Sequence, residues 1–138
     1  MQGEIKFRGK MIDNGEWVYG DYGRLSVRLK DGTEKICHYI GADLAFRQVD
    51  PETVGQYTGL HDKNGKKIYK SDICWKFGSG KDVQDEVVYQ NGAYGYCVEH
   101  QGFISFAENH NFHWKNGKSE HIEVIGNVFD NPELLEQE

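Results

Sequence analysis

The chain has 138 residues, enough for one domain or two small lobes that bury a core without disulfide bonds. The sequence contains eight Tyr, seven Phe and three Trp, together with 17 Gly and only two Pro. This composition excludes a proline-rich or disordered chain and favours an aromatic β core with tight turns. The net charge of −6 is unevenly distributed along the chain. Residues 1–50 contain eight basic and eight acidic groups, and residues 51–80 contain five basic and three acidic groups. Residues 81–138 contain three basic and eleven acidic groups. The acidic second half disfavours contact with nucleic acid there, because phosphate binding depends on Lys and Arg.

Targeting and redox signals are few. The N-terminus lacks an apolar stretch of signal-peptide length, and no segment approaches the roughly 20 apolar residues of a membrane span. We therefore expect a cytoplasmic protein without membrane contact. The three cysteines, Cys37, Cys74 and Cys97, are far apart and odd in number, so they are expected to be reduced core thiols.

The first fifty residues predict hairpins. Ile5 and Phe7 alternate with basic residues, which indicates a first strand with these two side chains inward, and a turn at 13–15 leads into a strand at 17–22. A second hairpin is predicted from strands at 25–29 and 34–40, joined by Asp31-Gly32. Residues 41–50 fit either a strand or a helical turn.

The centre of the chain predicts another hairpin. Apolar runs at 54–60 and 68–73 flank a turn over 62–65, where Asn-Gly favours positive φ angles. After it, strands are predicted at 71–77, at 85–90 and 94–98 around Asn91-Gly92, and at 102–106 and 122–128. Residues 109–117 predict an irregular loop or distorted turn. A short C-terminal helix is expected from Pro132, with Asn131 as its N-cap.

These elements predict a mainly β fold of antiparallel hairpins. Residues 1–50 form an N-terminal β lobe, and residues 51–138 form a second lobe that ends in the short helix. The second lobe is expected to be either a small bent sheet or an SH3-like barrel. The two lobes are either separate or one intimate unit.

The best candidate binding feature is the central hairpin, where lysines alternate with rings. Ammonium groups could contact phosphates while a ring stacks on a base, as in proteins that bind single strands. The alternative is a solvated hairpin tip whose lysines prevent pairing between sheet edges. The candidate residues are Tyr57, His61, Lys63, Lys66, Lys67, Tyr69 and Lys70.

Signals for chemistry are weak. His110 and His113 have a spacing that zinc ligands can have, but they lack the paired cysteines or HExxH pattern of a zinc site. Acidic groups near Asp85 and Glu120 and the Ser71-Asp72 pair have no partner at a catalytic spacing. We therefore assign no catalytic residue, metal ligand or cofactor.

Three blocks, in order along nearly the whole chain, resemble the YopX-like proteins of phages and prophages. They are residues 5–10 with 15–20, residues 54–60 with 62–65, and residues 123–127 with 131–135. Ser71 departs from the pattern, in which Gly or another small residue is expected. The resemblance implies a small phage protein that acts in the bacterial cytoplasm and self-associates. It supplies no activity, because the family is uncharacterised.

Three hypotheses follow. The first is a non-enzymatic accessory protein that binds itself, or a host or phage protein, through hairpins and sheet edges. The second is binding of single-stranded nucleic acid through the Lys63–Lys70 hairpin. The third is a metal-dependent hydrolase.

Overall fold

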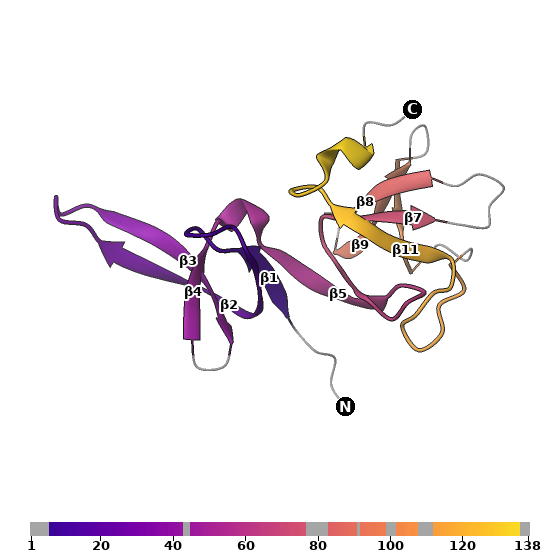
Figure 1. Cartoon of the computed structure of the whole chain (residues 1–138), viewed down its shortest axis with the longest axis horizontal. Coiled ribbons are helices and arrows are strands. Elements are labelled where there is room, and N and C mark those ends of the chain that lie inside the picture. Colours follow the sequence, from indigo (N-terminus) through magenta and orange to yellow (C-terminus); the bar gives the residue numbers. More distant parts are fainter. Residues whose placement is uncertain are drawn as a thin grey trace. The chain divides into compact units, whose positions relative to one another are not determined.

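The computed structural model describes residues 6–42, 45–76, 83–90, 92–98, 102–107 and 112–135. These residues are mainly β, which confirms the predicted fold class, and they fall into two compact units, residues 1–57 and 58–138 (Figure 1). The helices η1 (Pro51–Thr53) and η3 (Pro132–Leu135) are short 3₁₀ segments. No helix in the described ranges has the length and apolar character needed to cross a bilayer.

The first unit is an antiparallel sheet in the order β4-β3-β2-β1-β5. The predicted strands at 17–22 and 25–29 are one long strand, and the unassigned residues before Pro51 contain another. The strands of this unit are β1 (Phe7–Lys10), β2 (Trp17–Arg28), β3 (Glu34–Ala42), β4 (Ala45–Val49) and β5 (Gly55–His61), which continues into the second unit.

The small core of the first unit lies on one side of this sheet. Ile40 and Val49 are almost fully buried, and Gly9 packs closely beside them, because a Cβ there would lie only 3.1 Å from the Val49 Cβ. Of the two side chains predicted to point inward, Phe7 is described and Ile5 lies outside the described residues. Phe7 is only half-buried, whereas Arg8 is 5% exposed and places its guanidinium 4.6 Å from the centre of the Trp17 ring.

The second unit contains an antiparallel sheet in the order β10-β9-β8-β7-β11, and β6 lies beside β5. Among the described residues this sheet is open, with β10 and β11 at its ends, so the bent-sheet alternative is correct and the closed SH3-like barrel is not. The strands of the second unit are β6 (Lys67–Tyr69), β7 (Asp72–Lys76), β8 (Val83–Gln90), β9 (Ala93–Val98), β10 (Gly102–Ser105) and β11 (Ile122–Asn127).

Aromatic rings dominate the core of the second unit. Phe106 and Phe112 meet edge to face at 5.6 Å between ring centres, and Tyr96 packs on both. Cys74 lies in the same cluster, and burial raises the pKa of its thiol. The buried members are Ile68, Cys74, Val87, Tyr96, Phe106, Phe112, Ile122 and Val124.

Two local predictions need correction. The run 68–73 is not one strand, because Ser71 at φ 75° turns the chain between β6 and β7. At the C-terminus Asn131 does not cap η3 with its side chain; its Oδ1 accepts instead from the Asn127 N–H at 3.3 Å. Cys37 and Cys74 are buried free thiols as expected, and the Cys97 side chain lies outside the described residues.

Candidate functional site

The turn between β5 and β6 is built on the carboxylate of Asp62, which is 1% exposed. Its Oδ1 accepts from the backbone N–H groups of Asn64 and Lys66, each at 2.9 Å, and its Oδ2 accepts from the Val124 N–H at 2.9 Å. Gly65 closes the turn at φ 81°. Asp62 therefore holds the turn together and joins it to β11.

The seven predicted binding residues do not form one surface. The rings of Tyr57 and Tyr69 are buried, so neither presents a face on which a base can stack. Lys66 is exposed, and the remaining four, His61, Lys63, Lys67 and Lys70, are half-buried.

A second tight turn lies at residues 115–118, at the end of the segment 109–117 for which a loop or distorted turn was predicted. Lys115 and Lys118 exchange two backbone hydrogen bonds, of 2.9 and 3.0 Å. Asn116 and Gly117 between them have φ angles of 53° and 78°, which is the pattern of a type I′ turn. Because residues directly opposite in such a pair project to the same side, this turn presents two lysine side chains together.

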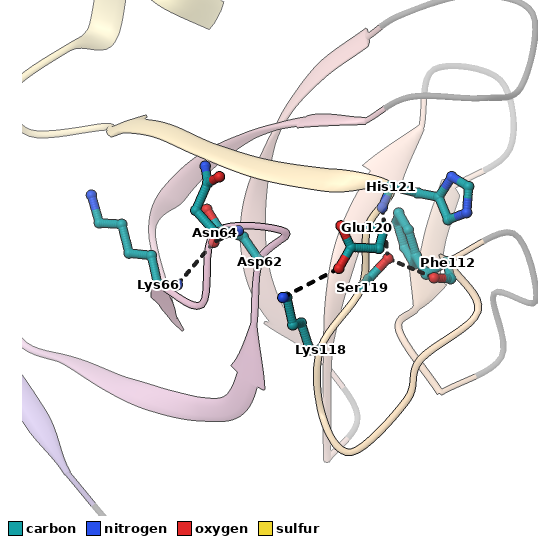
Figure 2. Close-up of polar contacts among 8 residues, drawn as sticks. All are labelled: Asp62, Asn64, Lys66, Phe112, Lys118, Ser119, Glu120 and His121. Atoms are coloured by element: carbon teal, nitrogen blue, oxygen red, sulfur yellow. Dashed lines mark hydrogen bonds and ion pairs between the residues drawn. The ribbon is translucent and has the colours of Figure 1, made fainter.

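Backbone bonds fix the two turns against each other. The His61 N–H donates to the Gly117 carbonyl at 2.6 Å, and the Ser119 N–H donates to the His61 carbonyl at 3.2 Å. The buried Ser119 hydroxyl in turn donates to the Phe112 carbonyl at 2.5 Å and accepts from the His121 N–H at 3.1 Å (Figure 2). These bonds connect the turn at residues 115–118 to the buried core and so fix its position beside His61.

A pocket of about 440 Å³ lies between the two turns. Lys118 forms an ion pair of 3.2 Å with Glu120 at this pocket, whereas the Lys66 side chain extends away from that pair (Figure 2). The pocket is lined by His61, Gly65, Lys115, Asn116, Lys118 and Glu120.

The histidines considered as zinc ligands and the Ser71-Asp72 pair do not form a reactive site among the described residues. Within the described ranges no three His, Cys, Asp or Glu side chains are grouped so as to hold a metal ion. His113 and His121 lie with ring centres 5.3 Å apart, and His110 is outside the described residues. Asp72, the neighbour of Ser71, accepts from the Tyr69 N–H at 2.7 Å and so closes the turn between β6 and β7.

Lys76 and Asp85 form a buried ion pair on β7 and β8. The ammonium also lies 3.2 Å from the centre of the Tyr96 ring. Burial lowers the pKa of Lys76, and the hydrogen bond to Asp85 opposes that change. Asp85 therefore neutralises a core lysine.

An apolar face lies on one side of β2, β3 and β4, and we define it by Tyr19, Leu25, Val27 and Phe46. Pairing places Leu25 opposite Cys37, Val27 opposite Lys35 and Phe46 opposite Gly41, so these side chains share a side of the sheet. Leu25 is 61% exposed and Phe46 75%. The Phe46 ring packs directly over Gly41, because a Cβ there would lie 2.4 Å from the ring and would displace it.

The comparisons with known proteins identify a family. The YopX protein family model matches residues 6–136. The chain belongs to the YopX family. None of the curated proteins matches it.

Two solved structures resemble this YopX-family chain over nearly its full length. Protein EF1440 from Enterococcus faecalis has 25% identity and a TM-score of 0.54, with 97% of this chain and 99% of the other covered. Protein yopX from Bacillus subtilis has 21% identity and a TM-score of 0.52, with 94% and 97% covered. The second likeness shows the fold alone.

Sequence reasoning missed half of the pocket in this YopX-family protein. It singled out the lysines before residue 71 and predicted residues 109–117 to be an irregular loop or distorted turn, without assigning them to a binding site. Lys115-Asn116-Gly117-Lys118 carried the missing signal, because Asn-Gly between two equivalent residues predicts a tight hairpin. Its position beside His61 depends on contacts across more than fifty residues, which no local pattern encodes.

Proposed function

We propose that this YopX-family protein is a non-enzymatic accessory protein of a phage or prophage, and that a second copy of the chain docks on its apolar face. The single observation that carries the proposal is the exposure of Leu25 and Phe46 on that face. Large apolar side chains gathered on one side of a small protein typically mark an interaction surface.

Charge favours a second copy as the occupant. The hairpin of β2 and β3 carries four basic residues and two acidic ones between residues 22 and 36, whereas residues 81–138 carry eleven acidic groups against three basic ones. Pairing places Lys35 on the apolar face, opposite Val27, and Arg24 and Arg28 on the other side of the sheet. The basic hairpin that carries the apolar face on one molecule therefore complements the acidic half of another. The basic residues are Arg24, Arg28, Lys30 and Lys35.

The non-enzymatic part of the proposal is supported by the roles of the polar groups in the core. Asp62 and Asp72 accept backbone hydrogen bonds at turns, and Asp85 pairs with Lys76. Groups held in this way have their hydrogen-bonding capacity used by the fold, whereas a catalytic group must be available to a substrate.

Sedimentation velocity on the full chain from about 1 to 100 µM tests the docking proposal. We expect concentration-dependent association, and we expect Leu25→Asp combined with Phe46→Asp to weaken it at least tenfold. Ile12→Asp is the matched control, because Ile12 is 57% exposed and lies outside the apolar face. Its association is expected to equal that of the wild type.

A chain that remains monomeric at about 100 µM overturns the second copy as the occupant. Loss of association in Ile12→Asp to the same degree overturns the assignment to the apolar face. Saturable turnover by the purified protein in a broad hydrolase and nuclease screen overturns the non-enzymatic function.

A further inference from the structure

We propose that the pocket between the two turns of the second unit binds a phosphate ester of a small polyol, such as a sugar phosphate or the sugar-phosphate part of a nucleotide. The pocket uses residues separate from the apolar face, so this inference does not rest on the docking proposal. It assigns a ligand class to His61, Lys115, Asn116, Lys118 and Glu120.

The first step is the gathering of cations. Residues 81–138 contain three basic residues against eleven acidic ones, and two of the three line this pocket. The type I′ turn presents Lys115 and Lys118 on the same side, and the backbone bonds of His61 bring an imidazole next to them. Two ammonium groups and a ring nitrogen are suited to a compact dianion, because lysine binds phosphate as a point charge.

The second step concerns the remaining polar lining. Glu120 pairs with Lys118 at 3.2 Å while its own side chain is 71% exposed, so a bound phosphate can replace it beside the ammonium. The released carboxylate and the Asn116 amide are hydrogen-bond acceptors, and hydroxyl groups are the donors that they fit. A ligand that carries a phosphate and hydroxyl groups satisfies both ends of the pocket.

The third step is a comparison with a nucleic-acid strand. The volume of about 440 Å³ lies within the range of small-molecule sites. The two tyrosines that could have stacked on bases are buried, and the Lys66 side chain extends away from the Lys118–Glu120 pair (Figure 2). Cations that converge on one pocket favour a single compact anion over a continuous strand, which needs a basic track with exposed rings.

The test is a nuclear magnetic resonance titration of the full-length protein with ribose 5-phosphate, inorganic phosphate and ribose. We expect saturable shifts of the His61 and Asn116 amide signals with ribose 5-phosphate, weaker ones with inorganic phosphate and none with ribose. Lys115→Gln combined with Lys118→Gln should raise the Kd for ribose 5-phosphate at least tenfold. Lys66→Gln, on the neighbouring turn, is the matched control and should change the Kd less than twofold.

Glu120→Gln separates the two proposed roles of the carboxylate without removing a cation. We expect this variant to bind inorganic phosphate more tightly, because Lys118 loses its competing partner, and to lose part of the preference for ribose 5-phosphate. It also keeps the proposal testable if the double lysine variant fails to fold.

Three results would overturn the proposal. One is the absence of saturable shifts at about 10 mM ribose 5-phosphate, a concentration that detects even millimolar affinity. Another is an equal loss of binding in Lys66→Gln, which would indicate diffuse attraction between charges. The third is binding of single-stranded oligonucleotides that tightens with length while ribose 5-phosphate does not bind, which would indicate a strand surface.

Discussion

At the scale of single residues, Asp62 stabilises the fold beyond its own turn, because its buried carboxylate also bonds to a distant strand. Its carboxylate satisfies three backbone N–H groups, two in its own turn and one on β11, sixty-two residues later. Loss of an acceptor leaves buried donors without a partner, and each such donor costs about 1–3 kcal/mol. The turn and the pocket wall therefore depend on one side chain.

We predict that Asp62→Ala lowers the free energy of unfolding by about 3 kcal/mol or more. Urea denaturation followed by tryptophan fluorescence measures this change. Asp31→Ala is the control, because Asp31 also accepts from a backbone N–H in a hairpin turn, that of Thr33, but is exposed. A loss as small for Asp62→Ala as for Asp31→Ala would contradict the prediction.

Ser71, where the family resemblance leads one to expect Gly or another small residue, adopts a backbone conformation that favours glycine. Its φ of 75° lies in the left-handed region, where a residue with a Cβ is strained by roughly 1–2 kcal/mol. We predict that Ser71→Gly stabilises the protein by roughly 0.5–1 kcal/mol, since glycine relieves the strain but loses more backbone entropy on folding. Thermal unfolding measures the effect.

Ser26→Gly, at an extended position of β2, is the opposite control for Ser71→Gly and should lower stability. If both variants lower the Tm equally, strain at Ser71 is not the reason.

At the scale of elements, β7 and β8 are joined by an unequal ion pair. The Lys76 side chain is 7% exposed and that of Asp85 is 26% exposed. Removal of one member of a buried pair is costly because the other charge stays buried, and the cost is greater for the more deeply buried charge. The two single substitutions should therefore differ.

We predict that Asp85→Asn costs about 3–5 kcal/mol of unfolding free energy and that Lys76→Met costs less. The pKa of Lys76 is lowered by burial, so the neutral amine is more accessible in the folded state than in the unfolded chain. Stability is consequently lost as pH falls through that lowered pKa, and the penalty of Asp85→Asn should shrink as pH is raised towards the usual lysine pKa. Urea denaturation at neutral pH and near pH 10 measures it, and a larger cost for Lys76→Met would be inconsistent with this account.

The same elements show how far the sequence can predict this fold. Asn-Gly and Asp-Gly turns predicted the hairpins of β2 with β3, β5 with β6, and β8 with β9, because turn chemistry is local. The break at Ser71 was missed, since serine gives no signal of positive φ. Burial of Arg8 and Lys76 was missed as well, because their partners Trp17 and Asp85 are recognised only once the strands are paired.

The candidate site, like the fold, could be predicted from the sequence only within single turns. The hairpin lysines were found from their spacing, but burial of Tyr57 and Tyr69 and the approach of Lys115 and Lys118 to His61 are tertiary. A sequence pattern indicates which residues share a turn. It does not indicate which two turns lie together.

At the scale of the whole molecule, the two units differ in how much apolar surface they bury. Among the described residues, the aromatic cluster has eight buried members, and all of them lie in residues 58–138. In the described part of the first unit the buried hydrophobic side chains are Cys37, Ile40, Val49 and Tyr57, whereas Leu25, Ile36 and Phe46 are exposed. Burial of apolar surface is the main term that opposes chain entropy, so local stability should follow this division.

We predict that hydrogen exchange in the full chain separates the two units. Amides of β7, β8 and β11 should exchange only by global unfolding, because these strands contribute buried apolar side chains to the aromatic cluster. Amides in the outer half of the β2–β3 hairpin, residues 24–36, should exchange by local opening at a much lower free energy. Exchange followed by nuclear magnetic resonance at rising urea concentration distinguishes the two, since global openings depend on urea and local ones hardly do.

If docking of a second copy protects the apolar face, hairpin protection should rise with protein concentration in the wild type and not in Leu25→Asp with Phe46→Asp. Equal protection of both regions at concentrations where the chain is monomeric would show that the exposed hairpin is stabilised by contacts other than those of its own small core.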